Sequence, residues 1–443
     1  MKHSLKSALA VLLLAIACGA AQAQKTLVIE GARIVPGDGK TIEKGTLVIT
    51  DDKIVSVQAD GEANAAALPA NAERIDGKGL TVYPGLIDAY CLAGVAGPPA
   101  QTSPRPQGGS GQRRQGQQQG RNATAPAAPA SYPIVWRKAT DGFNPKSNVL
   151  SALRNNGYTT CFLGSRGVLT PGEDVAVNLL PGETKAMVLQ DRAAINLNVI
   201  APGGNAYPTT LMGAIAFLRQ AFYDGIDSRN HPPAKPDARL DGLATAAEGK
   251  IPVFMSTNSE NDIKRALRIG SEFNLRMLLL GAAGVTKITG KVSAAKAGVV
   301  LTDDWSAAPE LAKAGIPFAL ASGKIDMTTG DADGMRERAM DLISKGLSAD
   351  VVLAAMTRTP ALLLGLTDRV GTVTPGKLAN LVISQGDLFS KEGKVKFVVV
   401  KGQKVEPVKI EADAGPKTTR VAFDGVPFTT TDVDDADGDG GNQ

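Results

Sequence analysis

The stretch "IPVFMSTNSENDIKRALRIGSEFNLRMLLLG", residues 251–281, decides the fold class. It opens with a short apolar run, continues with a segment whose apolar residues recur every three to four positions, and closes with a second apolar run. Such runs are typical of buried strands, and the middle period is typical of an amphipathic helix. A strand, a helix and a second strand in this order predict a βαβ unit in a parallel sheet.

The same alternation extends on both sides of this unit. Further strands are expected at 82–90, 158–164, 298–302 and 316–322, and further helices at 148–157, 211–225, 309–315, 335–346 and 348–365. Strand and helix alternating over this length favour a parallel sheet that closes into a barrel, and we place this barrel at residues 81–366.

Short strand patterns without helices occupy both ends of the folded region. Residues 24–80 include "TLVIEGARIV" and "GTLVITDDKIVSVQ", and residues 367–410 end in "KFVVVKGQKVE". Alternating apolar residues bounded by turn residues predict strands that are buried on one face. We expect the two segments to form a small β-sandwich domain together.

Residues 1–23 read as a cleavable signal peptide. Lys2 and Lys6 precede an apolar run at Leu9–Ala17, and Ala21-Gln22-Ala23 supplies a small-residue cleavage site. The run is too short to span a bilayer. We therefore expect a periplasmic or secreted protein, with a lipid anchor on Cys18 as the less favoured alternative, and no transmembrane segment.

Two other segments have compositions that do not predict a packed core. Residues 97–131 are rich in Gln, Gly, Pro and Ala, and we expect a disordered insertion, with a basic contact arm as the alternative. Residues 411–443 form a tail that ends in an acidic stretch resembling the start of a calcium loop, but lacking the rest of one. The formal net charge of +4 for 443 residues does not predict nucleic-acid binding.

Cys91 and Cys161 remain after removal of the signal peptide. An oxidising compartment permits a disulfide between them. We favour the alternative, two small buried apolar side chains, because spacing in the sequence does not establish proximity.

Four stretches resemble the metal-dependent amidohydrolase superfamily, and specifically its secreted imidazolonepropionase-like members. They are residues 31–57, "IDGKGLTVYPGLIDAY" at 75–90, residues 207–225, and "GLSADVVLAAMTRTPALLLGLTDRVGTVTPGKLANLVI" at 346–383. Within the last stretch the family commonly has Asp where this chain has Asn380. The resemblance implies an α/β fold, a (β/α)8 TIM-like barrel with a small β-sandwich domain formed by the N- and C-terminal segments.

The resemblance also implies a zinc or other divalent metal site at the mouth of the barrel. Its ligands are an HxH pair after strand 1, single histidines after strands 5 and 6, and an Asp after strand 8, with a Lys or Glu after strand 4 in some members. The matching positions of this chain hold Tyr90 and Leu92, Met255-Ser256-Thr257, Gly281-Ala282-Ala283, and Ser322-Gly323. The whole chain has two histidines, His3 in the signal peptide and His231 in a Pro-rich loop. We therefore expect no metal cofactor.

Other residues offer carboxylate or amine groups near the expected strand ends. They are Asp88, Lys185, Asp303, Asp304 and Asp326. Carboxylates hold hard divalent ions, but Asp also caps helices and Lys is commonly solvated. Asp88 is expected to orient local backbone, and Lys185 to be a solvated charge.

Three functional hypotheses follow. The first is a secreted pseudoenzyme that serves as a binding or assembly scaffold, with an active paralogue or a second copy of itself as the partner. The second is an active hydrolase of carbon–nitrogen bonds other than peptide bonds, with an unusual site at Asp88, Tyr90, Lys324 and Asp326. The third is a metal-free ligand binder whose mouth is lined by Tyr90, Ser256, Thr257 and Ser322.

Overall fold

A computed structural model describes residues 25–61, 72–95, 136–165, 169, 172–199, 207–323 and 333–410. The predicted signal peptide, the insertion at 97–131 and the tail at 411–443 lie outside the described residues, as do Lys324 and Asp326.

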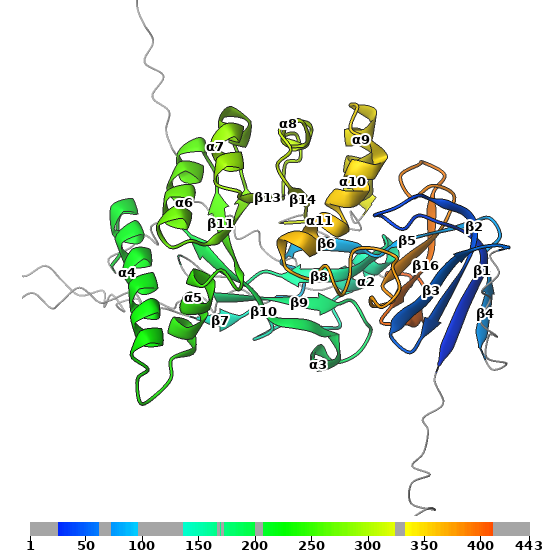
Figure 1. The fold of residues 1–443 in the computed structure, drawn as a ribbon, viewed down its shortest axis with the longest axis horizontal. Coiled ribbons are helices and arrows are strands. Elements are labelled where there is room, and N and C mark those ends of the chain that lie inside the picture. Colours follow the sequence, from blue (N-terminus) through cyan, green and yellow to red (C-terminus); the bar gives the residue numbers. More distant parts are fainter. Residues whose placement is uncertain are drawn as a thin grey trace, which may run out of the picture. The chain divides into compact units, whose positions relative to one another are not determined.

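The larger of two sheets forms the barrel (Figure 1). Its strand order is β14-β13-β12-β11-β10-β9-β8-β6, and β7 pairs with β9 at the side. The strands are β6 (Leu86–Cys91), β7 (Arg137–Lys138), β8 (Tyr158–Leu163), β9 (Gly172–Asn178), β10 (Val188–Asn198), β11 (Pro252–Thr257), β12 (Arg276–Gly281), β13 (Gly298–Leu301) and β14 (Phe318–Leu320). The βαβ unit at 251–281 is confirmed, because β11 and β12 pair in parallel.

The barrel closes between its first and last strands. Cys91, at the end of β6, forms a parallel bridge with Gly323, just beyond β14. The Gly323 N–H donates to the Tyr90 carbonyl at 3.1 Å. The predicted barrel is therefore confirmed as a nearly closed sheet.

One strand departs from the all-parallel arrangement expected of a (β/α)8 barrel. β9 pairs antiparallel with both β8 and β10, whereas β10 to β14 pair in parallel. An antiparallel step needs no crossover helix, and the four-residue α3 (Thr184–Met187) is the helix that the structure describes between β8 and β10. The reversal brings the start of β9 to the same end of the barrel as the ends of β8 and β10.

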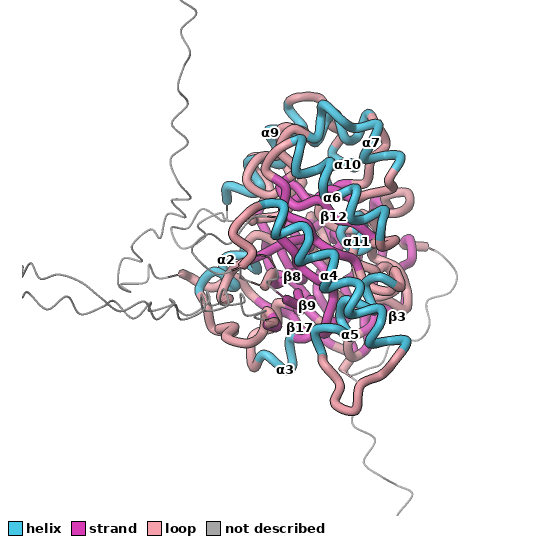
Figure 2. Tube along the Cα trace, turned by 90° about the vertical axis from the view of Figure 1, so that its left-hand side faces the viewer, coloured by secondary structure: helices cyan, strands magenta, loops and turns pink. Residues whose placement is uncertain are grey.

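The remaining described helices except α11 cover the outside of the barrel sheet, as Figure 2 shows for α4, α5 and α6, whereas Ala361 and Leu363 of α11 pack with side chains inside the barrel. The helices are α2 (Asn148–Asn155), α4 (Leu211–Asn230), α5 (Ala238–Ala247), α6 (Glu260–Glu272), α7 (Thr289–Ala294), α8 (Ala308–Lys313), α9 (Asp333–Ser344), α10 (Ala349–Ala355) and α11 (Arg358–Leu363), with a 3₁₀ turn at Val285–Ile288. Among these described helices, none is both long and apolar enough to span a bilayer.

The helix predicted at 348–365 is divided into α10 and α11. Pro360 has no N–H to donate to the carbonyl of Met356, four residues earlier. That carbonyl instead accepts the Ile87 N–H of β6 at 2.7 Å. The break thus attaches the helix pair to the first barrel strand.

The barrel strands pack apolar side chains on both faces, into one cluster inside the barrel and another outside it. Ile87, Ala89, Phe162 and Phe254 belong to the inner cluster. The residues between them on the same strands, such as Cys161 and Met255, belong to a cluster packed between the strands and the helices. Successive side chains of a strand point to opposite faces, so the cluster to which a residue belongs gives its direction.

The second sheet combines both ends of the described chain, as the sequence predicts. Its order is β17-β16-β15-β5-β1-β2-β3, with β4 beside β1. The strands are β1 (Thr26–Ile34), β2 (Ile42–Thr50), β3 (Lys53–Ala59), β4 (Glu73–Asp76), β5 (Leu80–Pro84), β15 (Leu381–Gln385), β16 (Lys394–Val400) and β17 (Gln403–Val405). It is one sheet that curls back on itself, because the Ile54 N–H donates to the Lys377 carbonyl at 2.9 Å, next to β15.

Asn380 connects the two sheets. Its side-chain amide donates to Thr160 Oγ1 of β8 at 3.0 Å and to Asn178 Oδ1 of β9 at 2.7 Å, and its Oδ1 accepts the Lys401 N–H at 2.9 Å. An Asp side chain, common at this position in the resembled family, has no N–H to donate. The two hydrogen bonds that its amide donates therefore explain why this chain has Asn rather than Asp at position 380.

Candidate site at the mouth of the barrel

The C-terminal ends of the parallel barrel strands define the mouth, where enzymes of this architecture place their sites. Polar side chains from β6, β9 and β10 converge there: Tyr90, Asp174 and Asn196. Ser165 joins them from the turn that follows β8. Asp174 comes from the beginning of β9, which reaches the mouth because this strand is reversed.

Tyr90 occupies the first position of the expected HxH pair. It packs in the inner cluster, is 9% exposed, and its ring lies 5.6 Å from that of Phe254. The Asn196 Nδ2 donates to the Tyr90 hydroxyl at 2.9 Å. A Cβ atom on Gly164 would lie 2.5 Å from the Tyr90 ring. The phenol therefore fills the inside of the mouth and requires glycine beside it.

Asp174 is the buried acid of the mouth. Its Oδ1 accepts the Ser165 N–H at 2.6 Å and the Ser165 hydroxyl at 3.0 Å, and its Oδ2 lies 3.4 Å from Asn196 Nδ2. The side chain is fully buried. Burial raises the pKa of Asp174 to about 7, although the hydrogen bonds from Ser165 and Asn196 act to lower it. Asp174 can thus hold or release a proton near neutral pH.

Asn196 links the phenol to the acid and keeps one acceptor free. Its Oδ1 is buried and has no hydrogen-bond partner within the part of the chain that the structure describes. Buried acceptors are normally paired with protein groups or water. A ligand that offers an N–H or O–H group would satisfy this oxygen.

Asp88, which the hypothesis of an active hydrolase places at the mouth, lies on the outer face of β6. Its neighbours Ile87 and Ala89 both belong to the inner cluster, so the fully buried Asp88 points toward the helices. Its Oδ1 accepts the N–H groups of Ser322 at 3.0 Å and Tyr90 at 3.3 Å, and its Oδ2 accepts the Ser322 hydroxyl at 2.5 Å. Asp88 thus orients backbone where the barrel closes.

Burial also affects the titration of Asp88. It raises the pKa of this carboxyl to about 6, and the hydrogen bonds from Ser322 and Tyr90 oppose the shift.

The mouth positions do not fit the metal site that the resemblance implies. Tyr90 and Leu92 join the inner apolar cluster, and Ser256 is the partly exposed polar residue at the end of β11. Thr257 alternates with Ser256, is buried and donates to the Leu280 carbonyl at 3.3 Å. Ser322 bonds Asp88 on the outer face, so Thr257 and Ser322 do not line the mouth as expected.

The other candidate ligands of the sequence are also apart from the mouth cluster. His231 follows α4, has an 80% exposed side chain and contacts Asp227 at 3.0 Å. Lys185 is exposed in α3, which joins the ends of β9 and β10 that are opposite the mouth. Asp304 accepts the Ser306 N–H and hydroxyl in a surface turn.

Asp303 is the exception among these carboxylates. Its Oδ1 lies 3.2 Å from the Cβ position of Gly323, at the end of the barrel where the sheet closes. Its backbone carbonyl accepts a hydrogen bond from Arg338 at 3.0 Å.

Sequence reasoning missed Asp174, Asn196 and Ser165. The strand pattern at 172–178, "GEDVAVN", begins at the glycine of the Pro171-Gly172 pair and was a usable signal. The sequence does not predict the reversed direction of this strand, because a strand has the same pattern of apolar residues whether it pairs parallel or antiparallel with its neighbours.

Comparisons with known proteins agree with the fold. A model of the amidohydrolase family matches residues 245–405. The crystal structure of an amidohydrolase from Thermotoga maritima is 22% identical with a TM-score of 0.69, and the match covers 86% of this chain and 100% of that chain. No curated protein matches the sequence.

Two further solved structures are more distant. A prolidase in complex with N-methylphosphonate-L-proline is 16% identical with a TM-score of 0.53, covering 87% of this chain and 100% of that chain. A mutant atrazine chlorohydrolase of Arthrobacter aurescens, in complex with zinc and atraton, is 16% identical with a TM-score of 0.51, covering 86% and 95%. Identities this low establish the fold alone. Residues 245–405 thus match the amidohydrolase family, and the solved structures show that this chain shares their barrel fold.

Proposed function

We propose that this chain is a secreted amidohydrolase-family pseudoenzyme: a protein without metal-dependent hydrolysis that uses the barrel as a binding or assembly scaffold. The observation that carries the proposal is the hydrogen-bonded group of Tyr90, Asn196 and Asp174, which fills the mouth where the resemblance requires imidazoles. A phenol that accepts a hydrogen bond from an amide N–H does not hold zinc as neutral imidazole does.

The chemistry of metal-dependent hydrolysis explains why this difference matters. A bound divalent ion lowers the pKa of its water and thereby creates the nucleophile. The whole chain offers two histidines, one of them in the predicted signal peptide and the other on the surface after α4. The barrel nevertheless keeps its packed interior and its closure, which is what a scaffold needs.

The proposed ligand is a small polar molecule with an N–H or O–H donor. Asn196 Oδ1 offers the acceptor, and Asp174 offers a carboxyl that changes charge near neutral pH. The proposed assembly partner is an active paralogue or a second copy of the chain, outside the cytoplasm.

The test uses the mature protein from Gln24 onward without a histidine tag. Hydrolysis of N-acyl amino acids, dipeptides and cyclic amides is followed with Zn²⁺, with Mn²⁺ and with a chelator. The proposal expects rates equal to the protein-free blank in every condition. Chelator-sensitive turnover would overturn it. Thermal-shift screening against small amides, dipeptides and sugars, and native mass spectrometry, then separate ligand binding from assembly.

One observation favours a second candidate, an active hydrolase of non-peptide carbon–nitrogen bonds. Asp174 is a buried carboxyl at the barrel mouth with a pKa near 7, as suits a general acid or base. Turnover that survives chelator and is lost in Asp174→Asn would establish this candidate. Turnover unchanged in Asp174→Asn would exclude Asp174 as its acid or base, and the absence of any turnover would exclude the candidate.

A further inference from the structure

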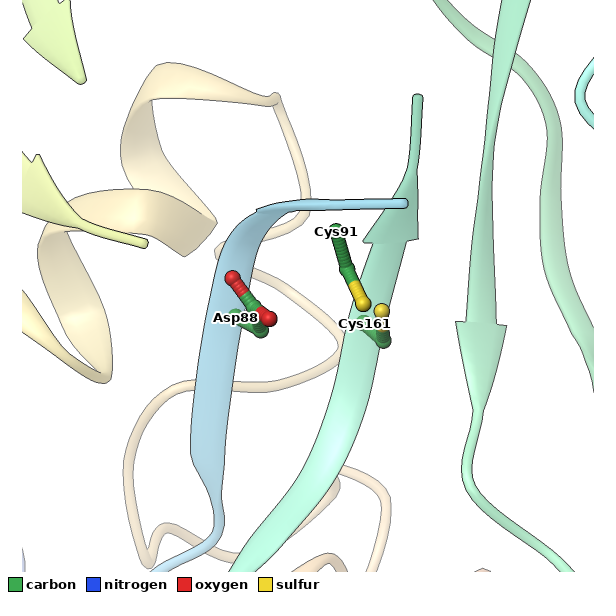
Figure 3. Close-up of side chains that lie close together, drawn as sticks. All are labelled: Asp88, Cys91 and Cys161. Atoms are coloured by element: carbon green, nitrogen blue, oxygen red, sulfur yellow. The ribbon is translucent and has the colours of Figure 1, made fainter. Parts of the chain in front are cut away.

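Three side chains outside the mouth cluster lie close together on the outer face of the barrel sheet. The ligand atoms of Asp88, Cys91 and Cys161 all lie within 4.8 Å of one another. Figure 3 shows the two sulfurs close together, with Cys91 and Asp88 on β6 and Cys161 on the neighbouring strand β8. All three side chains are buried, and both cysteines are free.

The group is held in position by its surroundings. Asp88 is fixed by Ser322, whose N–H and hydroxyl bond its two oxygens. The Ala93 N–H donates to Cys91 Sγ at 3.3 Å and holds this side chain in place. Two thiols and a carboxyl are therefore preorganised in one place.

The strand register argues against a disulfide between the two cysteines. Asp88 is paired with Cys161, and Cys91 is paired with Leu163, two residues further along β8. Strands about 4.8 Å apart with a rise of about 3.3 Å per residue put the two cysteine Cα atoms roughly 8 Å apart. A disulfide requires Cα atoms within about 7 Å. The sulfurs can share a ligand without moving the strands, whereas a covalent bond requires the strands to shift.

A thiophilic metal ion fits both the donors and their spacing. Zn²⁺ binds thiolate at about 2.3 Å and carboxylate at about 2.0–2.2 Å, so tetrahedral ligand atoms lie about 3.3–3.8 Å apart. Because the ligand atoms lie within 4.8 Å of one another, metal binding needs them to move together by at most about an ångström. Thiolates select zinc and Cu⁺ over hard ions such as Mg²⁺.

A neighbouring phenol adds an independent observation. Tyr158 precedes Cys161 on β8, packs in the same outer cluster, and is 1% exposed. Its hydroxyl has no hydrogen-bond partner in the described ranges. Buried polar atoms left in this way are commonly satisfied by water or an ion. The charges of Asp88, Cys91 and Cys161 act on the phenol, after burial itself, to raise its pKa well above the ordinary value.

We propose that Asp88, Cys91 and Cys161 bind one thiophilic d¹⁰ ion, Zn²⁺ or Cu⁺, in a structural site that joins β6 to β8. Binding releases the two thiol protons to solvent and forms two metal–sulfur bonds and one metal–oxygen bond, with no change of oxidation state. The site lies outside the inner cluster, so its ion does not take part in chemistry at the mouth.

The test begins with reduced, chelator-treated mature protein, titrated separately with Zn²⁺, Cu⁺ and Co²⁺. We expect one equivalent of Zn²⁺ or Cu⁺ to bind, and Co²⁺ to give the near-ultraviolet charge-transfer band of a thiolate–cobalt bond. Cys161→Ser and Cys91→Ser should each lose this band. Asp174→Asn, at the mouth, is the matched control and should keep both the band and the stoichiometry.

Several outcomes would overturn the proposal. The first is the absence of a charge-transfer band in the wild-type protein. The second is metal uptake that is undiminished in Cys161→Ser. The third is a purified protein that is two mass units lighter than the dithiol form, which would show a disulfide. The wild-type spectrum decides thiolate ligation by itself, so the test holds even where a cysteine variant fails to fold. The relative uptake of Zn²⁺ and Cu⁺ identifies the ion.

Discussion

Tyr90 and Asn196, 106 residues apart in the chain, are joined by a hydrogen bond of 2.9 Å inside the mouth of the barrel. The bond connects the first barrel strand, β6, to β10, and β8 and the reversed strand β9 lie between them in the sheet. Asn196 also contacts Asp174 of β9. It places a phenol and an amide where the resembled family would hold a metal between histidines.

Removing the Tyr90 hydroxyl should destabilise the protein. Tyr90→Phe leaves the Asn196 amide with the longer contact to Asp174, and a buried group without its partner costs about 1–3 kcal/mol. The free energy of unfolding, measured by urea denaturation, should fall by this amount. Tyr223→Phe is the control, since Tyr223 is 50% exposed and should change stability by less than about 0.5 kcal/mol. Equal effects of the two substitutions would contradict the account.

Gly164 should not tolerate a methyl group. In Gly164→Ala the new Cβ would lie 2.5 Å from the Tyr90 ring, and overpacking of this kind costs about 1–3 kcal/mol. The cost should shrink when the ring is removed, so a double-mutant cycle with Tyr90→Leu should give a clear coupling energy. Gly290→Ala in α7 is the control, because open space surrounds its Cβ position and alanine favours the helix. Additivity of Gly164→Ala and Tyr90→Leu would be evidence against the contact.

Asp174 should make stability depend on pH between about 4 and 7. Its folded-state pKa of about 7 lies above the ordinary value of 3.8, so between these values the folded protein binds a proton that the unfolded chain has lost. Stability from this group is present below pH 4 and is lost as the pH rises to 7, with a slope approaching about −1.4 kcal/mol per unit.

The pH dependence is isolated by difference. Asp88 also has a raised pKa, of about 6, and contributes in the same direction. The free energy of unfolding is measured at each pH for the wild-type protein and for Asp174→Asn, and the second value is subtracted from the first. The contribution of Asp88 is common to both proteins and cancels in this difference. The difference should fall from pH 4 to 7, and a flat or rising difference would show that Asp174 does not titrate as described.

Asn380 should be essential for the junction between the sheets. Asn380→Leu keeps the size of the side chain but leaves Thr160, Asn178 and the Lys401 N–H without their partner. We expect a loss of at least about 2 kcal/mol in the free energy of unfolding. Asn155→Leu, which removes two hydrogen bonds to Val408 at the surface, should cost less. A smaller effect at Asn380 than at Asn155 would refute the junction role.

The sequence predicts much of the fold because its apolar periods are strong. The strands at 252–257 and 276–281, and the helix between them, lie in the predicted order within the stretch 251–281. The joining of both chain ends in one domain was also predicted, although as a small β-sandwich and not as one curled sheet. The reversal of β9 was not, because the same alternation of residues serves either strand direction.

The candidate site was less predictable than the fold. The small number of histidines, two in 443 residues, is visible from composition alone. Asp174 and Asn196 meet Tyr90 only through the reversed strand, so their proximity depends on a pairing that no short motif encodes. Asp88 shows a different difficulty. It belongs to a motif that is recognisable in the sequence, but the direction of its side chain depends on the alternation along β6. That alternation places it on the outer face, beside Cys91, Cys161 and Ser322.

The most direct test of the central claim is an anomalous diffraction map at the zinc edge, from crystals of the mature, untagged and reduced protein grown with Zn²⁺. The account predicts no anomalous peak among Tyr90, Asn196 and Asp174 at the mouth. It predicts a peak between Asp88, Cys91 and Cys161. A fully occupied peak at the mouth would contradict the pseudoenzyme and make metal-dependent hydrolysis the leading function.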